Sequence, residues 1–419
     1  MRILLITWGS FGDVHPYMAI GLELRRRGHA VTIATSAVYE PKVRSEGLEF
    51  AAIRPNVGDL DPASLAGMME ARNGTQRVME YLVGWVRESY EDCLAAARQA
   101  DLVVTHQIPF GAALAARKLG LPWVSAVLAP VSFLSKYDAP VPAPAPWLAK
   151  LGALGPGPVG LLLRIARRQS LDWVKKVVEL EKELGLPYAG NPLFDAHHSP
   201  RRVLALFSSV FGPPRPDWPP QTVVTGFPFY DKHYEQPGMP AELERFLGDG
   251  DAPIVFSLGT SAVAAAGEFY RMSLEASQRL GRRAVFLTGK FEQGLPKEAM
   301  AAEYAPHSEL FPRAAAIVHH GGIGTTAQAM RSGRPMLVVP FSHDQFDNGA
   351  RVKRLGMGEV LYRTRYRVAS AEAKLRRLLE DPGYARTGLM VASQLSTEDG
   401  ITVAANAIEA EIAAAGRRG

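Results

Sequence analysis

Cysteine is nearly absent from this chain of 419 residues, which contains only Cys93. An internal disulfide bond is therefore excluded, and the sequence is compatible with a reducing compartment. We expect Cys93 itself to be a small, buried apolar residue.

Long apolar runs are also absent. The longest, residues 159–166, contains Arg164 and falls far short of the ~20 residues that span a bilayer. The first apolar run, residues 3–8, breaks at Gly9 and is too short for a secretory signal, so we expect a buried strand there. These absences predict a cytoplasmic protein that does not cross a membrane.

Neither sign of charge dominates, since 47 basic residues stand against 42 acidic ones and Lys and Arg are scattered along the chain. A basic nucleic-acid-binding arm is therefore excluded, whereas small anionic ligands remain compatible with the composition. Metal-binding motifs are missing too, because the pairs His197–His198 and His319–His320 lack the spacing of HExxH or CxxC sites. We expect no metal.

Strands and helices alternate along the chain in the way that builds parallel sheets. The length predicts two domains of roughly 200 residues each. Expected strands of the first domain are 3–7, 30–34, 102–105 and 123–128, with helices at 16–27, 39–46, 76–98 and 111–119. Expected strands of the second are 254–258, 284–287, 316–318 and 336–339, with helices at 269–280 and 326–332. The fold class is therefore α/β, with two doubly wound parallel sheets.

Proline clusters divide this pattern. A long loop is expected at 129–158, followed by helical sequence at 159–184, and a second cluster around 213–221 is interpreted as an interdomain linker. The predicted boundaries are 1–212 for the first domain and 222–397 for the second. A final helix at about 398–416 is expected to pack back on the first domain.

The most informative block is 319–326, where an apolar strand leads into His319 and His320, then glycines, then two threonines that open a helix. Glycines let main-chain N–H groups approach an anion, and the start of a helix favours negative charge. Gly259 and Thr260 form a second turn of this kind after another strand. The lysine of a P-loop and a GxGxxG motif are both missing, so the pattern indicates a different diphosphate site.

The run from Tyr304 to Gln345 resembles the donor-binding signature of the family 1 nucleotide-sugar glycosyltransferases. The opening segment, from Gly9 to Pro16 with Gly28 and His29 beyond it, is similar to the bacterial macrolide, sterol and rhamnolipid branch of that family. The resemblance implies a GT-B fold, in which two Rossmann-like domains face a cleft. It also implies inverting transfer of a hexose from a nucleotide diphosphate, without a metal or other cofactor.

Each donor-site role follows from this resemblance. Tyr304 stands where an aromatic ring stacks on the nucleobase, His307 near the nucleoside, and Gln328 at the ribose. The residues expected at the diphosphate are Thr260, His320, Gly322, Gly324 and Thr325. Asp344 and Gln345 match the pair that reads sugar hydroxyls, and a carboxylate with an amide suits that task because both accept hydrogen bonds and the amide also donates them.

Two differences from the plant members of the family leave two nucleotides, uridine and deoxythymidine, as candidates for the donor. Gln328 replaces a ribose-binding glutamate, and Ile323 replaces a common tryptophan. UDP-glucose is the favoured donor, with a dTDP-sugar as the alternative.

Catalysis needs a base, because the acceptor hydroxyl has a pKa far above 7. Asp13, just beyond the first strand, falls where plant members carry the catalytic histidine and several bacterial members an aspartate, so it is the predicted base. His15 is the rival, since an imidazole titrates near neutral pH. His106 matches the position of the plant aspartate that orients the histidine, which raises the hypothesis of an exchanged Asp13–His106 dyad.

The acceptor is expected to be a lipophilic small molecule such as a flavonoid, sterol, macrolide or hydroxy-lipid, with Phe110, Phe133 and Trp147 as candidate walls. Peripheral membrane contact is compatible with such a substrate. Two other functions stay open: a rhamnosyltransferase acting on a hydroxy-fatty-acid lipid, and a non-catalytic GT-B partner subunit.

Overall fold

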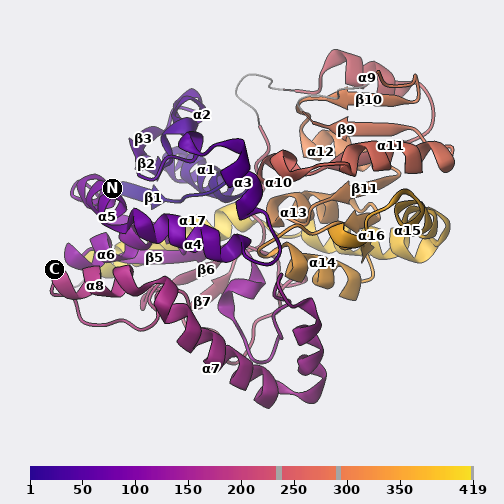
Figure 1. Ribbon diagram of the computed structural model, residues 1–419. Helices are drawn as coiled ribbons and strands as arrows, with labels where there is room; N and C mark the ends of the chain where they lie inside the picture. The colour runs from indigo at the N-terminus through magenta and orange to yellow at the C-terminus, as the bar shows by residue number, and fades with distance from the viewer. Residues whose placement is uncertain (233–237, 289–293, 417–419) are drawn as a thin grey trace.

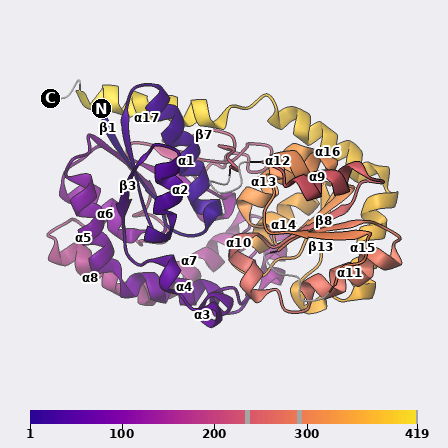
Figure 2. The same ribbon diagram turned by 90° about the horizontal axis from the view of Figure 1, so that it is seen from above.

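The computed structural model describes residues 1–232, 238–288 and 294–416, which form two α/β domains side by side (Figures 1 and 2). Each domain has a central sheet of parallel strands with helices on both faces. The predicted fold class is confirmed.

The first sheet has seven strands in the order β3-β2-β1-β4-β5-β6-β7. Its strands are β1 (Arg2–Ile6), β2 (Ala30–Thr35), β3 (Glu49–Ala52), β4 (Leu102–His106), β5 (Trp123–Val127), β6 (Val203–Ala205) and β7 (Thr222–Val224). Its main helices are α1 (Phe11–Arg26), α2 (Glu40–Ser45), α3 (Pro62–Met68), α4 (Gly74–Gly84), α5 (Val86–Ala97), α6 (Phe110–Lys118), α7 (Pro156–Trp173) and α8 (Lys175–Glu183). Strands β1, β4 and β5 are almost wholly buried because helices cover both faces of the sheet.

The second sheet has six strands in the order β10-β9-β8-β11-β12-β13. Its strands are β8 (Ile254–Ser257), β9 (Ala284–Leu287), β10 (Ala299–Ala302), β11 (Ala316–His319), β12 (Met336–Val338) and β13 (Gly358–Val360). Its helices are α9 (Ala241–Gly248), α10 (Gly259–Ala262), α11 (Phe269–Arg279), α12 (His307–Leu310), α13 (Ile323–Ser332), α14 (Gln345–Arg354), α15 (Val368–Glu380) and α16 (Pro382–Leu395).

The domain boundary lies further along the chain than the proline cluster suggested. Strand β7 pairs in parallel with β6, so the first domain extends at least to Val224 and the predicted linker at 213–221 falls inside it. Prolines mark a connection between two strands of one sheet here, which composition alone does not distinguish from a linker between domains.

The last helix, α17 (Gly400–Gly416), returns from the second domain to the first and lies along α1 (Figure 2). Ala404, Ala405 and Ile408 enter the apolar core of the first domain. Glu409 pairs with Arg27 at 2.7 Å, which adds a polar contact at the edge of this packing.

The segment between β5 and β6 also joins the domains. It contains two 3₁₀ helices, η3 (Pro130–Phe133) and η4 (Pro146–Leu154), before α7. The N–H of Val141 donates to Asp347 of α14 at 3.2 Å, and Val141 packs with Phe346. The expected helical stretch 159–184 is two helices, because the chain turns between Trp173 and Lys175. In the described ranges no helix is both long and apolar enough to span a bilayer.

Candidate functional site

The N-termini of two helices from different domains meet between the sheets. Helix α1 follows β1, and α13 follows β11. A Cβ atom placed on Gly324 of α13 would lie 3.8 Å from the Cα of Gly12 in α1. Because the positive ends of both helix dipoles point to this place, it favours a bound anion.

Asp13 lies in the first turn of α1, half-buried beside this meeting point. Its Oδ2 accepts hydrogen bonds from the backbone N–H and the hydroxyl of Ser10, at 2.8 and 3.0 Å, in a capping box. Gly9 has a φ of 138°, and a side chain there would overlap the carboxylate. Burial raises the pKa of Asp13 to about 6 against the opposing effect of the Ser10 bonds. The carboxylate is therefore held in one place, with a pKa suited to a base near neutral pH.

Asp344 approaches from the second domain as the N-cap of α14. Its Oδ2 accepts a hydrogen bond from the Asn348 amide at 2.7 Å. Burial raises the pKa of Asp344 to about 7; the Asn348 bond opposes the shift, and the negative charge of Asp13 adds to it. The structure thus brings two predicted site residues, one from each domain, within electrostatic reach.

His106 does not join Asp13. It ends β4 with its ring buried and edge-on to Tyr17, at a centroid distance of 6.0 Å. Burial and, to a smaller extent, the neighbouring His197 lower the pKa of His106 to about 3. In the described part of the chain neither residue hydrogen-bonds the other, so the exchanged dyad is not formed.

The rival base, His15, packs against aromatic rings. It is two residues from Asp13 on the same helix, and residues at that spacing point to different sides. Its ring contacts Phe11 and Tyr230, each at a centroid distance of 5.0 Å.

His320 lies between the two predicted phosphate turns. A Cβ atom on Gly259 would come within 2.7 Å of its Cε1, and one on Gly322 would overlap its Nε2. Both positions therefore need glycine. Burial lowers the pKa of His320 to about 4, and the nearby His307 adds to the shift. At neutral pH the ring is uncharged and carries a single N–H, and the ring already makes a hydrogen bond to the backbone of Ser257.

The turn after β11 is held by neighbours outside the predicted set. The N–H of Gly321 donates to His319 Nδ1 at 3.1 Å, and the carbonyl of Gly321 accepts from Asn348 at 2.9 Å. Thr326 donates its hydroxyl to the Gly322 carbonyl at 2.9 Å, whereas Thr325 stays half-exposed at the start of α13. Thr260 belongs to α10, and its side chain lies outside the described part of the structure.

The predicted nucleoside residues occupy one side of this turn. Gln328 on α13 is buried, and its Oε1 has no hydrogen-bond partner within the described ranges. Tyr304 donates its hydroxyl to the carbonyl of Asp231. His307 begins α12 and stacks on Phe311 at 4.3 Å, and burial lowers its pKa to about 4.

Gln345 is used by the protein itself. Its Oε1 accepts from the N–H groups of Phe341 and Ser342, at 2.8 and 3.1 Å. The predicted donating and accepting role is therefore reduced, since the amide nitrogen is the atom that remains for a ligand.

Asn348 was missed by sequence reasoning. It is fully buried, and its amide bonds both the carbonyl of Gly321 and the carboxylate of Asp344. Its position four residues after Asp344, on the same face of a helix, is the signal that could have found it.

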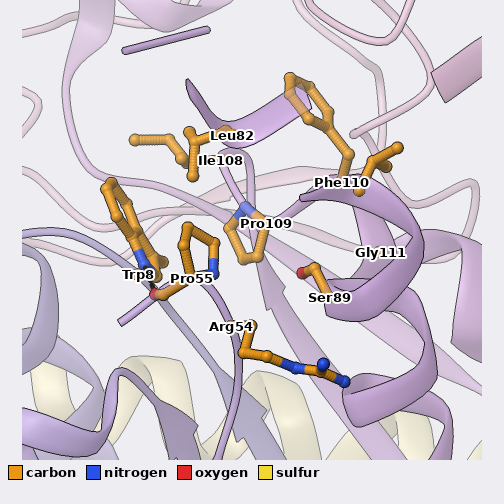
Figure 3. Close-up of a pocket in the computed structure, with 10 residues that line it drawn as sticks. Trp8, Arg54, Pro55, Leu82, Ser89, Ile108, Pro109, Phe110 and Gly111 are labelled. Carbon is orange, nitrogen blue, oxygen red and sulfur yellow. Dashed lines mark hydrogen bonds between the residues drawn. The ribbon is translucent and has the colours of Figure 1, made fainter. Parts of the chain in front are cut away.

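An apolar hollow lies in the first domain, at the ends of β1 and β4 (Figure 3). It is lined mainly by Trp8, Pro55, Leu82, Ile108, Pro109 and Phe110. The indole N–H of Trp8 donates to the Pro55 carbonyl at 2.6 Å and fixes one wall. Of the three predicted acceptor walls only Phe110 lines this hollow. Phe133 stacks on Trp218 at 4.1 Å, and Trp147 is 66% exposed.

Metal ligands do not gather in the described part of the chain, where no group of three or more His, Cys, Asp or Glu residues could hold an ion.

Both parts of the chain match known protein families. Residues 3–123 match the glycosyltransferase family 28 N-terminal domain, and residues 288–410 match the erythromycin biosynthesis protein CIII-like C-terminal domain. The chain is 34% identical to O-mycaminosyltylonolide 6-deoxyallosyltransferase of Streptomyces fradiae over 98% of this chain and 97% of that enzyme. It is 28% identical to sterol 3-beta-glucosyltransferase of Leptosphaeria maculans over 85% of this chain, which spans only 25% of that enzyme.

Solved structures show the same architecture. The calicheamicin glycosyltransferase CalG4 superposes with a TM-score of 0.74 at 20% identity, covering 98% of each chain. SsfS6 of Streptomyces sp. SF2575, solved with thymidine diphosphate, gives a TM-score of 0.65 at 21% identity, covering 96% of this chain and 98% of that one.

Proposed function

Because the chain belongs to the family 1 GT-B glycosyltransferases of the bacterial macrolide type, we propose that it transfers a deoxyhexose from a dTDP-sugar to a large apolar acceptor, with Asp13 as base. The observation that carries this proposal is the interdomain site where the N-termini of α1 and α13 meet and where Asp13 and Asp344 interact electrostatically. In this proposal the Asp13 carboxylate takes the proton of the acceptor hydroxyl, and the Asp344 carboxylate binds the sugar.

In the proposed reaction the acceptor hydroxyl gives its proton to Asp13 while its oxygen attacks the anomeric carbon. The bond from that carbon to the diphosphate oxygen breaks, and the electron pair leaves with the nucleotide. Configuration inverts because attack and departure occur on opposite faces. The fixed position of Asp13, held by Ser10, reduces the reorganisation that proton transfer requires.

Negative charge grows on the departing diphosphate, so its stabilisation is part of catalysis. The N-terminus of α13 and the turn at Gly321 and Gly322 offer backbone N–H groups to it. His320 is buried beside that turn and uncharged at neutral pH, so it brings no full positive charge to the diphosphate.

Two observations favour a dTDP-sugar over UDP-glucose. Gln328 offers one buried, unpartnered amide oxygen among the described residues, which suits the single free hydroxyl of a deoxyribose better than the adjacent pair of a ribose. The relative from Streptomyces fradiae is by its name a 6-deoxyallosyltransferase, and SsfS6 was solved with thymidine diphosphate.

The apolar hollow is too small to hold a lipophilic acceptor. Its volume of about 10 Å³ is far below the roughly 300–1,000 Å³ of typical ligand pockets. We therefore place a macrolide-sized acceptor between the domains, beside Asp13, and not in the hollow.

The test is a matrix of donors and acceptors with the purified chain. Donors are UDP-glucose and a set of dTDP-deoxyhexoses, and acceptors are macrolide aglycones, a sterol, a flavonoid and a hydroxy fatty acid. We expect nucleotide release and a glycosylated macrolide with dTDP-donors. Preference for UDP-glucose would overturn the donor assignment, and preference for the hydroxy fatty acid or sterol would overturn the acceptor class. No turnover with any pair would favour the non-catalytic alternative.

A further inference from the structure

An exposed apolar and basic surface lies on the first domain. It is formed by η4 and α7, and α7 runs along the lower edge of the molecule in Figure 1. We define the η4–α7 surface by Trp147, Lys150, Leu154, Leu161, Arg164, Ile165 and Arg168, all of which are exposed.

The apolar members of the η4–α7 surface are unusually open to solvent. Trp147 is 66% exposed, Leu154 70%, Leu161 53% and Ile165 48%. On α7, Leu161 and Ile165 are four residues apart and share one side of the helix. On η4, Trp147 and Lys150 are three residues apart and are aligned in a 3₁₀ helix. Exposed apolar side chains therefore recur along two helices that contact each other.

The segment that carries these apolar side chains is rich in positive charge. Residues 145–176 contain six Lys or Arg side chains and one acidic residue, Asp172. Arg167 pairs with Asp195, and Lys175 approaches Glu179. Within the described ranges Lys150, Arg164, Arg168 and Lys176 form no ion pair, so their charge is available to an external partner.

We propose that the η4–α7 surface docks this protein on an anionic phospholipid bilayer. Exposed Trp, Leu and Ile side chains beside unpaired Lys and Arg are the chemistry of helices that lie in the membrane interface, where apolar groups enter the acyl boundary and cations meet lipid phosphates. A neutral bilayer would satisfy only the apolar half of this surface, so the charge selects anionic lipid.

Docking in this way would serve a lipophilic acceptor. Helix α7 contacts α4, whose Leu82 lines the apolar hollow, and the loop before η4 packs on Phe346 of α14. The segment from 141 to 173 thus adjoins both α4 and the start of α14, the helix that has Asp344 as its N-cap. The docking proposal itself does not rest on the proposed reaction, because it follows from exposure and charge alone.

The experiment is vesicle flotation of the full chain, without donor or acceptor, so its outcome is independent of any transferase assay. We compare vesicles of phosphatidylcholine with vesicles of equal parts phosphatidylcholine and phosphatidylglycerol. Binding to the anionic vesicles is expected, with loss at high salt. Because each cation contributes about fivefold to binding, Arg164→Glu with Arg168→Glu should lower the partition coefficient at least tenfold, and Leu161→Ser with Ile165→Ser should also weaken it.

A matched control exists on α16, where Arg386, Leu389 and Met390 are exposed in a similar pattern. Arg386→Glu, Leu389→Ser and Met390→Ser should leave vesicle binding unchanged. Trp147→Phe gives a second readout that does not depend on a multiple variant: brominated lipids should quench tryptophan fluorescence in the parent chain and clearly less in this variant.

Three results would overturn the proposal: absence of binding to anionic vesicles, equal binding by the η4–α7 variants, or equal loss in the α16 control. A parent chain that elutes as a dimer, with the Leu161→Ser, Ile165→Ser variant as a monomer, would also overturn it, because the surface would then be an interface between copies.

Discussion

At the residue scale, the base is the most direct test of the site. Asp13→Asn keeps the size of the side chain and its place in the capping box but cannot take a proton. We expect a fall in kcat of about 10²–10⁴-fold with little change in dTDP affinity. Product formation and equilibrium nucleotide binding measure the two effects separately. His15→Asn is the control, and a larger loss there would make His15 the base.

The raised pKa of Asp13 predicts the pH dependence of the reaction. A base works only when deprotonated, so kcat/KM should rise through an acid limb near pH 6. The contribution of Asp13 to the stability of the fold changes with pH in the opposite direction. A carboxyl whose pKa is raised by folding stabilises the fold most below its ordinary pKa of 3.8, and this contribution is lost as pH rises through about 6.

Rate profiles and urea unfolding over pH 4–8 check both parts of this prediction. In Asp13→Asn the acid limb should disappear, and the free energy of unfolding should decline less between pH 4 and 7. An acid limb near pH 4 in the parent chain would show that the carboxylate is not buried as described.

Asn348 is a positioning residue, because it touches the Gly321 carbonyl and the Asp344 carboxylate and acts through them. Asn348→Ala leaves both acceptors unpaired, which costs roughly 1–3 kcal/mol. We expect the KM for the donor to rise about tenfold or more while the acceptor KM is kept. Two-substrate kinetics measure the donor KM and the acceptor KM separately. An equal change in the two KM values would point to general unfolding.

At the element scale, the strand–turn–helix units after β8 and β11 carry the diphosphate site. Gly322→Ala should abolish donor binding, because the new Cβ would overlap His320 Nε2 and push the ring out of place. Gly248→Ala, at the end of α9 in the same domain, is the matched control, because a Cβ atom there would meet nothing within 4 Å. Calorimetric titration with dTDP measures both variants, and equal affinity in the two would contradict the placement of His320.

The same elements show how far a sequence can be interpreted. The 319–326 turn and the place of Asp13 were predictable, because apolar strands followed by glycines and hydroxyls are local patterns. The use of Gln345 Oε1 by the loop at 341–342, the separation of His106 from Asp13, and the pairing of β7 with β6 were not. Those depend on side-chain direction and on contacts between distant segments, which periodicity does not encode.

At the scale of the whole molecule, the domains are joined by an apolar cluster and a buried ion triad. Arg351 on α14 bonds Asp138 of the first domain at 2.7 Å and Asp347 at 2.6 Å, and Arg351 and Asp138 are only 2% and 7% exposed. Asp347 also receives the N–H of Val141. The triad therefore fixes the loop of the first domain on the helix that carries Asp344 at its start.

Removing one member of the triad should loosen the pairing of the domains. Asp138→Ala leaves the buried Arg351 with one carboxylate fewer, and breaking a buried pair costs about 3–5 kcal/mol. We expect a lower midpoint of thermal unfolding and a larger radius of gyration by X-ray scattering. We also expect a higher KM for both substrates, since each domain provides the binding site of one substrate. Arg354→Ala is the control, because its 3.4 Å contact with Asp138 involves a guanidinium that is 57% exposed, and such surface pairs contribute about 0–1 kcal/mol. Equal effects of the two variants would show that the buried ion pairs of Arg351 do not hold the two domains together.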